Sequence, residues 1–555
     1  MKADTTRKLV GVSGDDPGNR YRFLFNALSQ LYPVEFRPVE PPGGVDLDGM
    51  IILDGKVEDG LKAADRGTPS YVVMGGPDEE SKRARADVRL GDSPLVEACL
   101  RGQVMPETDS AGLLRLAVQP GDEVLASREG HPVWLSRTAG GGVCVMVGSA
   151  PPQVREGGFV YRHLNGSRWL RLLPLMNFLR QLTREVDWQS PPSRACFVFD
   201  DPSLYWPSYG YLDYRRLGEH ARRHNYVVAI ATIPIDAWWV KGSVASIFRS
   251  FSPRLSLLIH GNNHTSRELL HEEPGTTGLA AVAQALGRME RLEHRHGLAV
   301  SRIMVAPHGA IANHLFPHLL KLGYDAALVT THLLVQHNST ESWPATFGLN
   351  KSEIVGGGLP VIPRIRLSRE WKNDVLIAAF LRQPIVIAGH HQDAARKLEL
   401  LERIGKTVNG LPGASWSDMR DILQSNYLQR VDGDGLRIRM YSRRVVVPVP
   451  PGVRRLWVER TWVKPDSTEK LVVKSARDAV FDGETGATAG PLALNGAEEI
   501  EVVSQVANPV HFSTVARPAV HPWSITRKIL METRDRIAPV LPFALRRRFW
   551  IDNSP

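Results

Sequence analysis

The chain has 555 residues, of which 43% are hydrophobic, 23% charged and 7% aromatic. This composition is that of a globular protein, so intrinsic disorder, a collagen-like fibre and a disulfide-stapled miniprotein are excluded. The 68 Lys and Arg residues exceed the 59 Asp and Glu residues by only nine, and we expect no nucleic-acid partner.

The cysteines and the N-terminal residues indicate the compartment. Cys99, Cys144 and Cys196 lie far apart and mostly inside apolar runs, which predicts buried free thiols in a reducing environment. The first twenty residues lack the apolar stretch of a signal peptide, and no apolar run approaches the ~20 residues of a membrane span. We therefore expect a cytoplasmic protein.

Short apolar runs alternate with helix-like stretches over residues 7–183. This alternation predicts a parallel sheet covered by helices, and the layout resembles flavodoxin-like and amidotransferase-like modules. We expect a doubly wound α/β domain over residues 1–186. The domain is predicted to be non-catalytic, because its third strand ends in Val73-Met74-Gly75-Gly76, where an amidotransferase would carry its cysteine nucleophile.

A proline-containing linker, DWQSPPSR, separates this domain from a second β/α pattern over residues 193–430. Seven or eight apolar strands separated by helical patterns fit a distorted (β/α)7 barrel, whose chemistry gathers at the carboxyl ends of its strands. Over residues 437–516 the pattern changes to β-branched alternation with Gly and Pro turns, which predicts a small accessory β-sandwich.

The tail, residues 517–555, combines basic and aromatic side chains. It holds eight basic residues against three acidic ones. This composition fits a basic amphipathic segment that contacts a membrane surface. The alternative is a helix that docks on its own protein and turns a basic face to solvent.

Polar residues follow three of the predicted barrel strands. Asp200 and Asp201 end the first strand, and adjacent strand residues point to opposite sides of the backbone. His260 and His264 follow LSLLI at a spacing of four, which places both on one side of a helical turn and lets them share a cation with one aspartate. Such a set leaves positions open for water and substrate.

The third strand end carries His390 and His391, after PIVIAG, and offers an imidazole, the side chain that most often donates protons in catalysis. Adjacent strand residues face opposite ways, so only one of the two histidines faces the barrel mouth, and the sequence does not fix which. His390 is our first choice for the donor and His391 the second. Tyr205 and Trp206 lie in the first loop, where aromatic rings either bind sugar faces or pack the loop.

These motifs resemble those of the polysaccharide deacetylases, metal-dependent carbohydrate esterases with a (β/α)7 barrel. The resemblance covers roughly residues 193–425. It implies that Asp200 is the general base and that Asp201, His260 and His264 hold a divalent metal, zinc first and cobalt or nickel next.

The same resemblance implies that VAPHGA is the third motif and forms a wall of the substrate groove, with Pro307, His308 and Gly309 as substrate contacts. The family pairs an arginine of this motif with the catalytic aspartate, and Arg302 is the nearest candidate here. A histidine of the last motif, His390 or His391, is the implied acid.

We therefore expect a metal-dependent hydrolase that removes the acetyl group from an N-acetylated sugar, oligosaccharide or glycolipid precursor. Two alternatives remain. The same barrel could hydrolyse a non-sugar amide, or it could be a non-catalytic scaffold for polysaccharide assembly.

Overall fold

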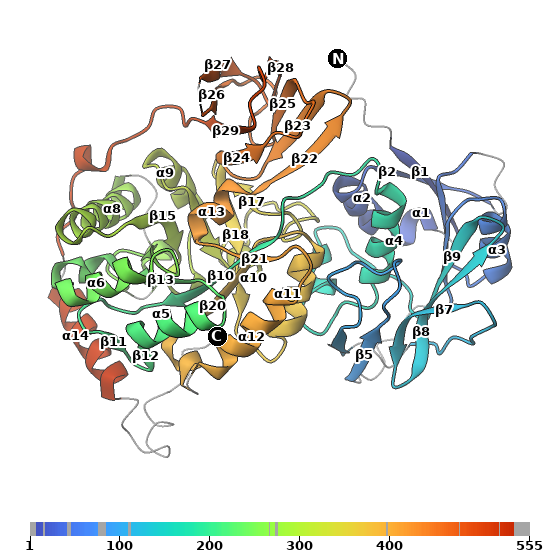
Figure 1. The fold of residues 1–555 in the computed structure, drawn as a ribbon, viewed down its shortest axis with the longest axis horizontal. Helices are drawn as coiled ribbons and strands as arrows, with labels where there is room; N and C mark the ends of the chain where they lie inside the picture. The colour runs from blue at the N-terminus through green and yellow to red at the C-terminus, as the bar shows by residue number, and fades with distance from the viewer. Residues whose placement is uncertain are drawn as a thin grey trace. The chain divides into compact units, whose positions relative to one another are not determined.

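The computed structural model describes residues 7–14, 17–40, 46–75, 85–108, 113–265, 267–271, 276–395, 398–476, 478–520 and 522–537. The chain forms two compact units, drawn in Figure 1, and each is described by itself. The first unit comprises Met1–Gln189, Ser342–Asn350 and Ser368–Gln383; the second comprises Ser190–Glu341, Lys351–Leu367 and Pro384–Pro555. In the described residues, no helix is both long and apolar enough to cross a bilayer.

The first unit contains a nine-stranded sheet that is half parallel and half antiparallel. Its parallel half has the strand order 2-1-3-4-5 of flavodoxin-like folds, in β2 (Val34–Pro38), β1 (Lys8–Ser13), β3 (Gly49–Ile52), β4 (Ser70–Val73) and β9 (Gly142–Val147). The antiparallel half continues with β8 (His131–Ala139), β7 (Glu123–Arg128), β5 (Ala86–Leu90) and β6 (Val104–Glu107). The prediction of a wholly parallel sheet is therefore wrong for this half. Gly76, part of the motif discussed above, lies outside the described residues.

The helices of the first unit include one that the sequence pattern placed in the barrel. They are α1 (Pro17–Arg20), α2 (Arg22–Leu31), α3 (Val57–Asp65), α4 (Leu173–Thr183) and α11 (Trp371–Phe380), with the 3₁₀ turn η1 (Val160–His163). Within α11, Asn373 is fully buried and its Nδ2 donates to the carbonyls of Pro106, at 2.9 Å, and Gly166, at 2.8 Å. These hydrogen bonds fix α11 to the first unit.

The second unit contains the sheet that carries the motif residues. Its strands run in the order β17 (Glu353–Val355), β18 (Leu359–Pro363), β16 (Ala326–Val329), β15 (Val300–Val305), β14 (Leu255–His260), β13 (Val228–Thr232), β10 (Arg194–Asp200), β20 (Ile385–Gly389) and β19 (Ile365–Arg366). The short strand β21 (Ser415–Trp416) also pairs with β10. Every pair is parallel except β17 with β18, and no ladder joins the two ends of this order among the described strands.

Helices and turns connect these strands or follow them in the chain. They are α5 (Tyr214–Arg223), α6 (Gly242–Phe251), α7 (Glu268–His271), α8 (Thr276–His296), α9 (Phe316–Lys321), α10 (Thr331–His337), α12 (Glu399–Asn409), α13 (Met419–Gln424) and α14 (Pro522–Ile537), the hairpin β11 (Ser208–Tyr209) with β12 (Leu212–Asp213), and the 3₁₀ turns η2 (Pro234–Trp239), η3 (Pro307–Gly309), η4 (Asn313–Leu315), η5 (His391–Ala394) and η6 (Phe512–Thr514). The strands between them are buried on both faces, which explains their nearly continuous apolar sequences.

Two four-stranded sheets follow the barrel and enclose a core of their own. One sheet has the order β22 (Tyr427–Asp432), β23 (Gly435–Met440), β25 (Arg455–Arg460) and β28 (Thr488–Ala493). The other has the order β24 (Arg444–Pro448), β29 (Glu499–Ser504), β26 (Glu469–Ser475) and β27 (Ala479–Thr485). This β-sandwich begins ten residues before the predicted start at residue 437.

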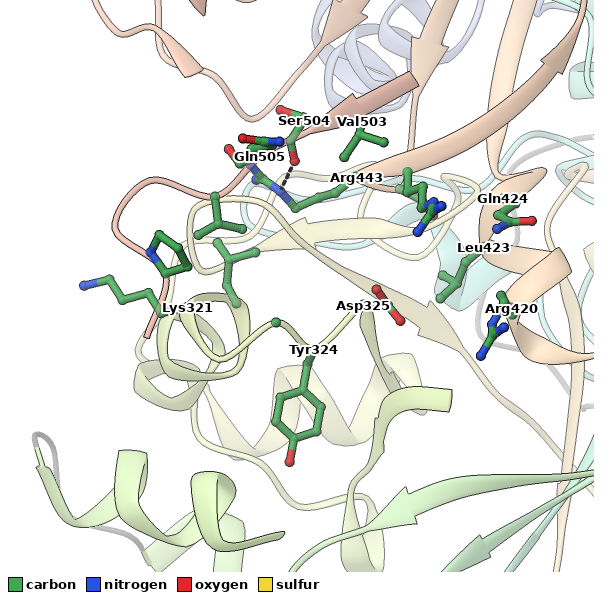
Figure 2. A pocket seen from close by; sticks show the side chains of 16 residues that line it. Lys321, Tyr324, Asp325, Arg420, Leu423, Gln424, Arg443, Val503, Ser504 and Gln505 are labelled. Atoms are coloured by element: carbon green, nitrogen blue, oxygen red, sulfur yellow. Dashed lines mark hydrogen bonds between the residues drawn. The ribbon is translucent and has the colours of Figure 1, made fainter. Parts of the chain in front are cut away.

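A pocket of about 410 Å³ lies where the sandwich meets the barrel strands (Figure 2). Asp325, which directly precedes β16, lines it together with Arg443, whose Nε donates to the carbonyl of Ser504 at 3.1 Å. Because Asp325 precedes its strand, the pocket lies at the amino ends of the parallel strands. The motif residues follow their strands and lie at the opposite ends.

Replacing Asn373 with alanine should lower the free energy of unfolding of the first unit. The change removes both hydrogen bonds. The partly buried carbonyl of Gly166 loses this donor, whereas that of Pro106 keeps the hydrogen bond from Nε1 of Trp169, and we expect a cost of about 1–3 kcal/mol. Urea unfolding checks the value, with Lys470→Ala as control, because that lysine pairs with Asp482 on the exposed surface and should contribute less than about 1 kcal/mol. Equal effects of the two changes would contradict this role of Asn373.

Candidate metal centre

Side-chain alternation along the strands brings four polar residues to one place. The interior of the barrel is a single apolar cluster to which alternate positions of the strands contribute, among them Val198, Leu258, Ile362 and Val386. In a strand, residues two or four apart share a face. Asp200, His260, Arg364 and His390 follow these interior residues by two or four positions, so they extend the interior face beyond the carboxyl ends of the strands.

Asp200 is paired with an arginine that the sequence analysis did not identify. Nη2 of Arg364 donates to both carboxylate oxygens of Asp200, at 2.7 and 2.8 Å, and both side chains are more than nine-tenths buried. Arg302, the candidate from the third motif, instead donates to Glu293 at 2.5 Å. Since Ile303 points into the barrel, its neighbour Arg302 points out, and its predicted pairing with Asp200 is wrong.

Asp201 faces the two histidines of the second motif. Its Oδ1 lies 3.2 Å from Nε2 of His260 and 3.0 Å from Nε2 of His264. The three side chains form a group that could hold a metal ion, with all ligand atoms within 4.8 Å of one another. The structure thus brings together the three residues predicted as ligands.

The chemistry of this donor set fits a divalent cation. Nδ1 of His260 lies 3.0 Å from the carbonyl oxygen of Val305, so in the neutral ring Nδ1 carries the proton and Nε2 presents its lone pair to Asp201. Asp201 Oδ1 is buried, and within the described part of the chain no donor is aligned to give it a hydrogen bond. A carboxylate oxygen and two imidazole lone pairs that converge in this way are ligands of the kind that zinc takes.

The charges of the cluster shift two pKa values in opposite directions. Burial opposes ionisation of Asp201, but the charges of His264 and His260 outweigh it and hold the pKa of that carboxyl well below its usual value. Burial also disfavours a charged His260, yet Asp200 and Asp201 raise the pKa of that imidazole. The site therefore favours a carboxylate at Asp201 and attracts positive charge.

A loop, not a helical turn, carries His264. His260 is the last residue of β14, and the next residues are irregular, so the predicted helical turn is wrong. The carboxylate of Glu268 accepts hydrogen bonds from the backbone N–H groups of Asn262, Asn263 and His264, at 2.6–3.0 Å. This carboxylate holds the loop in the shape that returns His264 to His260.

The backbone around the cluster is strained. Three non-glycine residues adopt the left-handed conformation there: Asp201 at φ 83°, His264 at φ 55° and His308 at φ 55°. Gly261 has φ 60°, and a Cβ there would lie 2.1 Å from Glu268 Oε1. Such conformations cost free energy and concentrate at functional sites.

The two histidines after β20 have different surroundings. His390 has a side chain 59% exposed, with Nε2 4.0 Å from Oδ2 of Asp201. His391 has a side chain only 2% exposed, stacked against Tyr211 and in edge contact with Tyr209. Only His390 faces the candidate ligands.

The predicted substrate contacts are divided between two places. His308 is exposed, and its ring centroid lies 5.2 Å from that of His264. Pro307 is buried against Gly261, and Gly309 is half-buried beside Leu333. Tyr205 and Trp206 instead line a pocket of about 400 Å³ whose other walls come from η2 and α14.

A second histidine group lies elsewhere in the second unit. His220, His224 and Glu402 have ligand atoms within 4.8 Å of one another, and the sequence analysis did not consider them as ligands. Nδ1 of His220 lies 2.7 Å from the Tyr226 hydroxyl, and the Glu402 side chain is 51% exposed. The carboxylate of this group is thus about twice as exposed as that of Asp201, whose side chain is 25% exposed.

Comparison with known proteins finds no matching family model and no matching curated protein. Solved structures similar to this chain include a candidate polysaccharide deacetylase from Mycobacterium smegmatis, with 14% identity, 42% of this chain and 92% of that chain covered, and a TM-score of 0.30. They also include a family 4 carbohydrate esterase from Streptomyces lividans, with 14% identity, 41% and 93% covered, and a TM-score of 0.26.

A family 4 pseudoenzyme from Bacillus anthracis is similar as well, with 11% identity, 42% of this chain and 66% of that chain covered, and a TM-score of 0.25. In all three comparisons the identity is at most 14% and the alignment covers about two-fifths of this chain.

Replacing Asp201, His260 or His264 with alanine should lower the bound metal to well below one equivalent, because each change removes one of three ligands. Elemental analysis of the gently purified protein measures this. His294→Ala is the matched control, since His294 is exposed and lies outside the cluster. Full metal content in all three variants would reject the ligand assignment.

Proposed function

We propose that the chain is a metal-dependent hydrolase that removes an acetyl group from the nitrogen of an acetylated sugar, oligosaccharide or glycolipid precursor. The observation that carries this proposal is the different pairing of two adjacent carboxylates. Asp200 binds an arginine, whereas Asp201 faces two imidazoles. One carboxylate is therefore available for proton transfer and the other for a cation.

Asp200 is the proposed general base. Arg364 engages both of its oxygens and fixes the orientation of the carboxylate beside the neighbouring cluster. In hydrolysis Asp200 accepts a proton from the attacking water, whose oxygen forms the new bond to the acetyl carbon. Arg364 acts through Asp200 and is a positioning residue.

Asp201, His260 and His264 are the proposed ligands of the cation. When bound, a divalent ion would polarise the acetyl carbonyl and make a water molecule more acidic. His390 is the proposed acid, because it is the exposed histidine beside Asp201. It donates a proton to the nitrogen as the C–N bond breaks, so acetate and a free amine leave.

The motifs of the polysaccharide deacetylases support an acetylated carbohydrate as substrate. Phe199-Asp200-Asp201 resembles the first motif of that family and the His260–His264 pair its second motif. A metal-binding barrel could also hydrolyse a non-sugar amide, and a barrel without metal could be a scaffold. The experiment below separates these alternatives.

The zinc-loaded protein should release acetate from N-acetylglucosamine oligomers, and Asp200→Asn should lower this rate by about 10²–10⁴-fold while metal content stays unchanged. His294→Ala should keep both properties. Full activity of Asp200→Asn would contradict its role as base. Metal-loaded protein that hydrolyses only non-sugar amides would favour the amidohydrolase, and metal-free protein that resists reconstitution would favour the scaffold.

The variants His390→Asn and His391→Asn should differ in which property is lowered, the catalytic rate or the melting temperature. The first should lower kcat, because His390 lies beside Asp201, and should leave the melting temperature unchanged, because the side chain is exposed. The second should lower the melting temperature, because it removes a ring packed against Tyr209 and Tyr211. The reverse pattern would make His391 the acid.

A further inference from the structure

Helix α14 lies across the carboxyl ends of the barrel strands and is held there by its charged residues. Nζ of Lys528 lies 2.9 Å from Oδ2 of Asp236, in η2, and both side chains are more than nine-tenths buried. Asp535 accepts a hydrogen bond from the Tyr209 hydroxyl at 2.6 Å. Arg527 donates to the backbone carbonyl of His264.

An ordinary surface helix buries its apolar face. Helix α14 does the reverse: it buries polar and charged side chains and exposes apolar ones. Its buried residues are Ser524, Lys528 and Asp535. Ile529 and Leu530 are each 58% exposed, and the other exposed apolar residues of the helix are Trp523, Ile525 and Ile537. The helix docks on its own protein, as in the alternative given by the sequence analysis, but at Lys528 its basic face is turned inward and not to solvent. Residues 538–555 of the predicted tail lie outside the described residues.

Three tryptophans continue this apolar face. Trp238, in η2, is 56% exposed, and Trp206 and Trp239 are about two-fifths exposed. Trp206, Trp239 and Ile529 line the same pocket of about 400 Å³, so η2, the first loop and α14 share one surface. We use the name mouth surface for these three residues, Trp206, Trp239 and Ile529, together with their exposed chain neighbours Trp238 and Leu530.

Cations accompany the aromatic rings of the mouth surface. Nζ of Lys241 lies 3.6 Å from the ring centroid of Trp206, and Arg536 lies over the same ring at 5.2 Å. Arg291 lies over Trp238 at 4.5 Å. The sequence after α14 adds Arg546, Arg547 and Arg548, followed by Phe549 and Trp550.

We infer that the mouth surface docks on the headgroup region of an anionic lipid bilayer. Tryptophan with adjacent Lys and Arg is the composition of segments that lie in a membrane interface, where rings enter the acyl boundary and cations meet anionic headgroups.

Docking would bring the candidate metal centre to the membrane surface. The same helix contacts the His264 carbonyl and lies against the loop that carries Tyr209, next to the strand that ends at Asp200. If the proposed function holds, the acetylated sugar is then presented by a lipid. The docking inference itself does not rest on that function.

Sedimentation of the full-length protein with vesicles tests the inference. The protein should bind vesicles of phosphatidylcholine mixed with phosphatidylglycerol and not phosphatidylcholine alone. Ile529→Glu/Leu530→Glu should weaken binding by roughly tenfold or more. Lys241→Ala should weaken it about fivefold at low salt. The matched control is Leu114→Glu/Val431→Glu, which adds the same charge at residues 45% and 48% exposed on other elements.

Three outcomes would overturn the inference. One is a protein that does not bind anionic vesicles, and another is a double variant on α14 that binds like the wild type. The third is a dimer that this double variant converts to a monomer, measured by light scattering, without vesicle binding, which would assign the surface to a second copy. The triple variant Arg546→Ser/Arg547→Ser/Arg548→Ser should still bind anionic vesicles through the mouth surface. Metal content measured on the same samples separates failure of docking from failure of the proposed function.

Discussion

The ion pair between Asp200 and Arg364 is the constraint on which the site depends. Two carboxylates that are adjacent in sequence would otherwise compete for the same cation. The guanidinium engages both oxygens of Asp200, and only Asp201 is left to face the imidazoles. A buried carboxylate without a partner would be costly, so Arg364 also makes the position of Asp200 tolerable within the protein.

The remaining geometry follows from the barrel and one loop. Strand alternation aims Asp200, His260, Arg364 and His390 at the same region, since each continues an interior position of its strand. His264 has no strand to place it. The carboxylate of Glu268 performs that task by accepting three backbone hydrogen bonds from the loop, and Arg288 donates to the side-chain oxygen of Asn262 in that loop at 2.6 Å.

The sequence predicts the parts of this site that depend on local patterns. The apolar strands predict the parallel sheet, and the residues at their ends include Asp201, His260 and His264, which the structure brings together. Arg364 was missed because it is a single arginine far from Asp200 in sequence. It follows Ile362 by two residues, so strand alternation would have predicted that its side chain points inward. The inward charges of α14 and the place of α11 in the first unit depend on tertiary contacts that no local pattern encodes.

Anomalous diffraction from crystals grown with zinc tests the central claim most directly, because it locates the ion relative to both carboxylates. We predict one zinc ion, at about 2.0–2.2 Å from a carboxylate oxygen of Asp201 and from Nε2 of His260 and of His264. Asp200 should remain paired with Arg364. A peak bonded to Asp200, or zinc found only at His220, His224 and Glu402, would contradict the account.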